Sequence, residues 1–248
     1  MSIPAHVRTS VRWCAIGAAA IAMMYAGYVG ATWLRYGHTS DAPPDERDLT
    51  LDEFMPVYDI VERHHIRVHA PAEITLAAAT DLNLMQSSIA RALFKGRELI
   101  LGSEPDTVPR PHGLLAFMRS IGWAVLTDVP GQEIVMGAVT QPWEANVAFR
   151  PLPPSDFSAF DRPGFVKIAW TLRVDRVSAT ESIFRTETRA MPTDATARRT
   201  FRRYWALLSP GIIVIRWALL EPLKNEAERR ASQGAVIATG IPAEGRLP

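Results

Sequence analysis

The sequence predicts an α+β protein in which antiparallel strands lie between helices, with a long C-terminal helix and one membrane-spanning helix at the start. Three observations lead to this fold class. An uncharged apolar run covers residues 13–34, strict strand-like alternation marks residues 165–175, and an apolar helical stripe begins near residue 201. The 248 residues suffice for one domain with an added anchor.

The apolar run, WCAIGAAAIAMMYAGYVGATWL from Trp13 to Leu34, predicts a transmembrane helix after a flank of residues 1–12. At about 1.5 Å per residue it would extend roughly 33 Å, which matches a hydrocarbon core of about 30 Å. A cleaved signal peptide is the alternative, since Val29-Gly30-Ala31 could be a processing site. Secretory apolar regions usually span only about 7–15 residues, so we expect an uncleaved anchor.

The same helix has a stripe of small residues, Ala18, Ala22, Ala26 and Gly30. Small residues every fourth position let two helices approach closely, so a homodimer through the transmembrane helix is one expectation. Alanine as ordinary apolar filler is the alternative. The arginines before the run place the amino end in the cytoplasm of a bacterial inner membrane, with the main domain outside.

Composition sets the domain boundaries. Residues 35–57 contain HTSDAPPDERD and predict a linker, so the folded domain is expected over residues 58–232. The small residues of 233–248 have no apolar period and predict a disordered tail.

Hydrophobic periods then predict the elements in order. A strand is expected at residues 59–68, followed by helices at 71–81, 87–99 and 114–120. Further strands are expected at residues 122–128, 132–141, 143–150, 165–175 and 181–190, with a turn at Pro130-Gly131 and a loop at PLPPSD, residues 151–156. The alternation in FVKIAWTLRVD, residues 165–175, is typical of a sheet with one buried face.

The C-terminal region returns to helix. An apolar stripe is formed by Phe201, Tyr204, Trp205 and Leu208. Ser209 is a natural N-cap and Pro210 a natural first residue, so a second helix is expected from there to about residue 232. A second membrane pass is disfavoured because Arg216 and Glu221 would each cost at least about 2.5–3.5 kcal/mol at mid-bilayer.

Composition also excludes several functions. Lys+Arg of 27 against Asp+Glu of 26 gives a net charge of +1, so no field favours nucleic acid. One cysteine cannot form a disulfide or a thiolate metal cluster within the chain. No nucleophile elbow, P-loop or dinucleotide glycine pattern is present, and we predict no cofactor.

Four segments resemble the START-like helix-grip superfamily, also called SRPBCC or polyketide cyclase-like, in a bacterial form. They are HAPAEI (residues 69–74), VPGQEIVMGAV (129–139), TETRA (186–190) and FRRYWALLSPGIIVIRWALLEPLK (201–224). Such patterns specify the fold better than an activity. Pro222 departs from the continuous final helix that is usual in the family.

The resemblance implies a curved sheet wrapped around the C-terminal helix, with a cavity between them for a lipid, sterol, polyketide or other apolar molecule. We therefore expect a membrane-anchored domain that binds a lipid-like ligand. One alternative is a cyclase or dehydratase that uses Glu62 and His64 for proton transfer. Another is a protein-interaction module with a filled core.

We choose candidate ligand-binding residues by their apolar character and by the side of the strand or helix on which they lie. They are Met136, Trp143, Trp170, Tyr204 and Trp205, for which plain core packing is the alternative. Arg189 joins them if its strand face turns inward; otherwise Arg185, Glu187 and Arg189 line a solvent face. We predict no metal site, because the adjacent His64 and His65 point to opposite sides of a strand.

Overall fold

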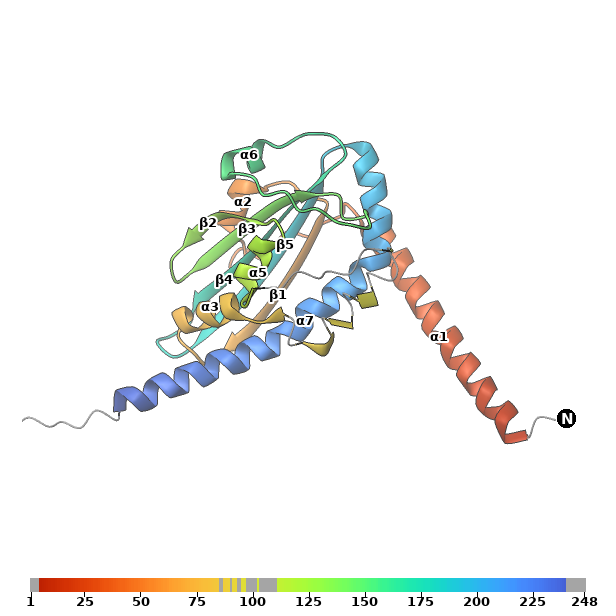
Figure 1. The fold of residues 1–248 in the computed structure, drawn as a ribbon, viewed down its shortest axis with the longest axis horizontal. Helices are drawn as coiled ribbons and strands as arrows, with labels where there is room; N and C mark the ends of the chain where they lie inside the picture. Colours follow the sequence, from red (N-terminus) through yellow and green to blue (C-terminus); the bar gives the residue numbers. More distant parts are fainter. Residues whose placement is uncertain are drawn as a thin grey trace, which may run out of the picture.

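The centre of the computed structural model, which describes residues 5–84, 87–89, 91–92, 95–96, 102 and 111–239, is one antiparallel sheet. Its five strands lie in the order β1-β5-β4-β3-β2 (Figure 1). They are β1 Ile60–Val68, β2 Ala124–Val129, β3 Glu133–Thr140, β4 Val166–Arg176 and β5 Ser182–Pro192. The sheet packs against a long C-terminal helix, α7 (Ala195–Thr239), which confirms the predicted α+β class.

One face of the sheet, called here the helix side, is covered by α7, α3 (Ala72–Asp81) and α5 (Leu114–Ser120) (Figure 1). Alternation along each strand turns every second residue toward these helices. The resulting core includes Val68, Leu76, Ile134, Met136, Trp170, Leu172, Phe184, Leu220 and Leu223. Burying these apolar side chains holds α7 along the sheet, since each contributes roughly 1.5–3 kcal/mol.

The opposite face carries two short helices that the sequence did not reveal, α2 (Leu49–Phe54) and α6 (Pro154–Ala159). Residues 49–54 fell in the predicted linker and 154–159 largely in a predicted loop. Each helix is too short to show a hydrophobic period, but Asp48 caps α2 by accepting a bond from the Leu51 amide at 2.7 Å. Packing against the sheet therefore begins before the predicted domain boundary, since Tyr36 already packs against Ile60, Val166 and Ala190.

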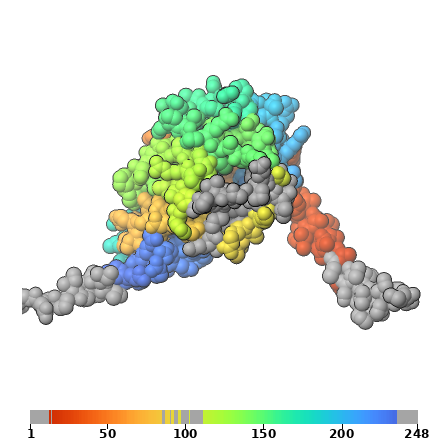
Figure 2. Space-filling view, in the orientation of Figure 1, coloured from red at the N-terminus to blue at the C-terminus, as the bar shows by residue number. Residues whose placement is uncertain are grey.

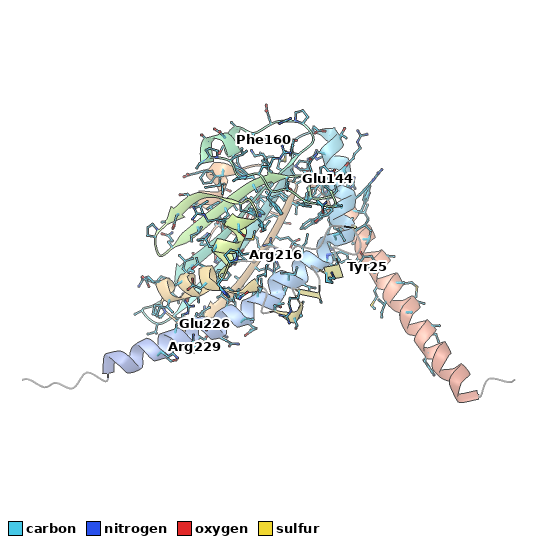
Figure 3. All side chains as sticks on the ribbon, viewed as in Figure 1. Tyr25, Glu144, Phe160, Arg216, Glu226 and Arg229 are labelled. Carbon is cyan, nitrogen blue, oxygen red and sulfur yellow. The ribbon has the colours of Figure 1, made fainter. Side chains whose placement is uncertain are left out.

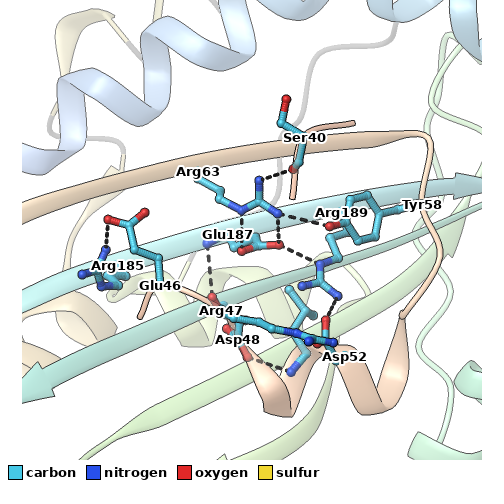
Figure 4. A network of polar contacts seen from close by, with 12 residues as sticks. Ser40, Glu46, Arg47, Asp48, Asp52, Tyr58, Arg63, Arg185, Glu187 and Arg189 are labelled. Atoms are coloured by element: carbon cyan, nitrogen blue, oxygen red, sulfur yellow. Dashed lines mark hydrogen bonds and ion pairs between the residues drawn. The ribbon is translucent and has the colours of Figure 1, made fainter. Parts of the chain in front are cut away.

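The expected solvent face of β5 is instead buried beneath α2. The Arg189 guanidinium donates to Glu187 at 2.7 Å, to Asp52 at 2.6 Å and to the Met55 carbonyl at 2.8 Å (Figure 4). Arg63 donates to the other oxygen of Glu187 at 2.9 Å. These bonds satisfy charges that would otherwise be costly to bury, and they fasten the segment that follows α1 to the sheet.

Helix α1 (Ala5–Arg35) leaves the body of the molecule as a single projecting helix (Figures 1 and 2). Its apolar stretch Ala15–Arg35 is long enough to cross a membrane and none of it is buried. A signal sequence near the amino end would share these properties. Helix α7 is also long and apolar enough to cross a membrane, but part of it is buried in the domain.

The predicted break between two helices at Ser209-Pro210 is wrong, because α7 runs continuously through Pro210 and Pro222. Ser209 is buried and shares a hydrogen bond of 2.9 Å with the Tyr28 hydroxyl, so it serves a helix contact rather than a cap. Proline in a helix costs one backbone bond and bends the axis, and Figure 1 shows α7 bent between its first and second parts.

Three further expectations need adjustment. Residues 233–239 of the predicted disordered tail are helical, while 240–248 lie outside the described residues. The predicted strand at 143–150 consists of turns, with one isolated bridge between Val139 and Arg150, because the segment turns directly after Pro142. The predicted helix at 87–99 is described only in part: residues 88–89, 91–92 and 95–96 are helical, while 90, 93–94 and 97–99 lie outside the described residues.

Glu133 and Asp48 form a buried pair of carboxyl groups where α2 meets β3, with 2% and 3% of their surfaces exposed. Burial, together with hydrogen bonding to and repulsion from Asp48, raises the pKa of Glu133 from 4.5 to about 8, although Thr50 and Arg173 oppose the rise. The folded protein therefore keeps a proton on Glu133 near neutral pH.

This proton makes stability depend on pH. The unfolded chain releases it above the ordinary pKa of 4.5 and the folded chain only near 8, so stability declines as pH rises between these values. We expect the free energy of unfolding to fall by several kcal/mol across this window, since one pKa unit corresponds to about 1.4 kcal/mol. Glu133→Gln should remove most of the slope in thermal unfolding of the detergent-solubilised protein.

Glu53→Gln is the matched control, since Glu53 is exposed on α2, the helix that meets β3 at Glu133. Retention of the full slope in Glu133→Gln would show that Glu133 is not the group responsible.

Candidate functional site

A row of side chains crosses four strands on the helix side of the sheet. Glu62 on β1 pairs with Thr188 on β5, Thr188 pairs with Trp170 on β4, and Trp170 pairs with Met136 on β3. Directly opposed residues of antiparallel strands share a face, so all four face the layer that contains α7. The structure thus brings together Glu62, Trp170 and Met136 among the predicted residues.

Buried polar atoms without partners gather in this layer. They are His64 Nε2, Trp123 Nε1, Trp170 Nε1, Thr188 Oγ1 and Arg216 Nε, which we call the interior polar cluster. The Trp123 and Trp170 rings meet edge to face at 6.2 Å, and Figure 3 places Arg216 on the side of α7 toward the sheet. Most buried polar atoms in proteins are hydrogen-bonded, so a group of unsatisfied ones indicates a site for a missing partner.

The donor character of the cluster defines what could satisfy it. Indole Nε1 and guanidinium Nε are donors only, a hydroxyl can donate, and a neutral imidazole donates from one nitrogen. Its natural partner is therefore an oxygen that accepts hydrogen bonds, such as a carbonyl or carboxylate oxygen. Surrounding side chains are apolar, so the rest of such a partner would be apolar too.

His64 belongs to this cluster and Glu62 lies beside it, on the side of β1 that strand alternation predicts. Burial, together with the nearby charge of Arg216, lowers the pKa of His64 from 6.5 to about 4. Burial raises the pKa of Glu62, while Arg216 opposes that rise. His64 is therefore neutral near pH 7, and its contact with Glu62 at 3.9 Å between Nε2 and Oε2 is neither an ion pair nor a hydrogen bond.

This geometry is poorly suited to proton transfer. A catalytic base works best when its pKa is near the operating pH, and His64 lies well below it. The 3.9 Å separation also exceeds the reach of a direct transfer. The pair gives the site a neutral imidazole and a carboxyl group beside a buried cation.

Other predicted lining residues lie elsewhere. Trp143, Tyr204 and Trp205 belong to a second core cluster at the start of α7, packed with Tyr36 of the chain after α1. Arg189 lies on the opposite face from Trp170, bound to α2, so it does not reach the layer between the sheet and α7. The sequence of β5 could not show which of its faces meets α7, because both faces are buried.

Sequence reasoning missed three members of the cluster, Thr188, Trp123 and Arg216. Arg216 was noted only as a charge that disfavours a membrane pass. A lone arginine in an otherwise apolar helical run was the available signal, since such a charge must be paired or placed with care. Thr188 and Trp123 carry no distinguishing pattern in the sequence.

Two surface hollows are formed by described residues. The first, of about 680 Å³, is lined by Ala72, Glu73, Pro130, Gly131, Gln132, Val174, Asp175 and Arg176. The second, of about 420 Å³, is lined by Gln141, Glu144, Ala145, Asn146, Ala148 and Arg150. Neither is lined by the interior polar cluster. Within the part of the chain that the structure describes, no three His, Cys, Asp or Glu residues are grouped to hold a metal ion.

Neither a family model nor a curated protein matches the chain. Solved structures with some likeness include the hypothetical protein jhp0584 from Helicobacter pylori, at 7% identity and a TM-score of 0.35, covering 76% of this chain and 96% of that one.

Another is the Zhui aromatase/cyclase from Streptomyces sp. R1128, at 14% identity and a TM-score of 0.24, covering 69% and 94%. A third is the di-domain ARO/CYC BexL from the BE-7585A biosynthetic pathway, at 15% identity and a TM-score of 0.23, covering 68% and 46%. At these TM-scores neither fold nor function follows from the likeness.

Replacing Arg216 tests the electrostatics of the site. In Arg216→Met the pKa of His64 should rise above about 4, because a nearby positive charge is removed, yet stay below 6.5, because burial remains. Titration of the imidazole by NMR measures this shift. Arg203→Met, an exposed change on the same helix, is the control. An unchanged His64 pKa in Arg216→Met would exclude the proposed proximity.

Proposed function

We propose that this protein is a membrane-anchored START-like helix-grip domain that binds an apolar, lipid-like molecule between the sheet and α7. The observation that carries the proposal is the interior polar cluster, whose five unsatisfied atoms come from three strands, α7 and the residue before β2. A buried hydrogen-bond donor without an acceptor costs about 1–3 kcal/mol. A ligand oxygen that accepts hydrogen bonds from several of these donors would therefore bind more tightly.

The chemistry of the layer supports a ligand with an apolar body and an oxygen-bearing end. The helix-side core supplies aliphatic and aromatic surface, including Met136 and Leu172, and the cluster supplies the donors. Arg216 adds a positive charge, which favours a carboxylate. A fatty acid is the simplest molecule with both properties.

Anchoring to a bilayer is supported by the exposed apolar surface of α1. Trp13, Ile21, Met24 and Leu34 are 69%, 65%, 68% and 73% exposed. A protein in water rarely exposes an apolar surface of this extent, whereas lipid would cover it. We infer that α1 spans a bacterial inner membrane, with the amino end in the cytoplasm and the folded domain outside.

The cyclase or dehydratase alternative has less support. It requires proton transfer through Glu62 and His64, whose closest atoms are 3.9 Å apart, with a histidine that is a weak base near neutral pH. The binding role needs no such transfer.

Replacing Thr188 by valine tests the binding role. The change keeps the shape of the side chain and removes an unsatisfied hydroxyl, so the empty protein should be as stable as before or slightly more so. Affinity for a fluorescent fatty acid should fall about tenfold, which corresponds to about 1.4 kcal/mol. Fluorescence titration of the full chain in detergent, with thermal unfolding alongside, gives both quantities.

Thr171→Val is the matched control on the neighbouring strand. Thr171 faces the other side of the sheet and accepts a bond from the Glu187 amide at 3.2 Å, so its replacement should lower stability and leave fatty-acid affinity unchanged. Absence of fatty-acid binding by the wild type, together with no lipid in its extracts by mass spectrometry, would contradict the proposed function.

A further inference from the structure

Helix α1 and the first part of α7 are held together by three polar contacts. Arg202 donates to the Trp33 carbonyl at 3.0 Å, Tyr28 shares a bond of 2.9 Å with Ser209, and Tyr25 donates to the Leu207 carbonyl at 2.5 Å. The level of Trp33 on α1 thus coincides with that of Arg202 on α7, and the level of Tyr25 with that of Leu207. The depth of α1 in a bilayer therefore fixes the depth of α7.

The ends of the apolar run on α1 give that depth. Leu34 is its last apolar residue, and Tyr25 lies nine residues before it, which is about 13 Å along a helix. If Leu34 marks the edge of the hydrocarbon, Leu207 lies at the level of Tyr25, well inside one leaflet of a core about 30 Å thick. The residues that follow Leu207 lie near the same leaflet.

The surface of α7 at this point suits lipid. Leu207, Val214 and Trp217 are 50%, 46% and 63% exposed, at spacings that place them along one side of the helix. The only charge between Arg203 and Glu221 is Arg216, and it faces the sheet beside Glu62. The charge that disfavoured a membrane pass is thereby kept away from the exposed apolar side.

The residues at the expected membrane edge suit headgroups. The Arg202 guanidinium lies over the Trp33 ring at 4.2 Å, and the exposed Arg203 follows it in the chain. Aromatic rings and arginines of this kind settle at the boundary between hydrocarbon and headgroups. Both helices therefore cross this boundary at the same level.

Only the bend of α7 is free to enter lipid. Phe201 and Trp205 before it, and Leu220, Leu223 and Ala227 after it, are buried in the domain core. Figure 1 shows α1 and the second part of α7 leaving their junction in different directions. Helix α7 therefore enters and leaves on the same side.

We propose that the bend of α7, residues 207–217, inserts into the outer leaflet beside α1 and seats the domain on the membrane. This inference rests on the membrane anchor of the proposed function. Trp217 also contacts the His64 ring, with 5.8 Å between centroids, so the inserted bend adjoins the interior polar cluster. A lipid-like ligand would then pass between bilayer and site without crossing water.

Single-cysteine labelling tests the insertion. In full-length protein carrying Cys14→Ser, cysteine is placed at Val214, at Ile21 on α1, or at Val177 in the turn between β4 and β5, and labelled with an environment-sensitive fluorophore. Val177 is the matched control, because it is also a valine with 46% exposure. The samples are reconstituted in phosphatidylcholine vesicles with and without nitroxide-bearing lipids.

We expect blue-shifted emission and quenching by nitroxide lipids at Val214→Cys and Ile21→Cys, and neither effect at Val177→Cys. Quenching at Ile21→Cys, with Val214→Cys resembling Val177→Cys, would overturn the insertion while leaving the anchor intact. No quenching at Ile21→Cys would remove the anchor and the insertion together. Leu207→Cys repeats the measurement if Val214→Cys does not fold, and a blue shift there without quenching would indicate a protein contact and contradict insertion.

Discussion

The packing of α7 against one face of the antiparallel sheet is the constraint on which the rest of the structure depends. Because side chains alternate along each strand, this packing sends Glu62, Thr188 and Trp170 to the helix side and Arg189 to the other. It also turns Arg216 toward the sheet. The interior polar cluster exists only because these elements meet, since its atoms come from segments distant in the sequence.

The two faces of the sheet differ in how their buried polar and charged groups are paired. On the face under α2, Arg189 and Glu187 are fully engaged with one another and with Asp52 and Arg63. On the helix side, His64, Thr188 and Arg216 leave atoms without partners. A satisfied network holds a structure together, whereas unsatisfied donors in an apolar layer favour the arrival of another molecule. Glu133 Oε1 on the α2 face also lacks a partner, so what sets the helix side apart is that five such atoms lie in one layer.

In the proposed function, α7 joins the binding face to the membrane. Its buried side packs on the sheet, its first part bonds to α1, and its exposed side at the bend is apolar. The proline at position 210 allows one helix to meet both partners, because it bends the axis without ending the helix. In this arrangement the anchor, the bend and the site are three parts of one continuous unit.

The sequence by itself determined the elements whose periods are long and regular. These were the five strands, α3, α5, the apolar α1 and the apolar stripe of α7, because repeated burial of one face leaves a readable pattern. It also placed Glu62 and His64 on the buried side of β1. Only the tertiary structure decided that α2 and α6 form, that α7 continues through Pro210, and that Arg189 lies beneath α2. Short helices, a tolerated proline and a sheet buried on both faces depend on contacts with distant residues, which no local pattern encodes.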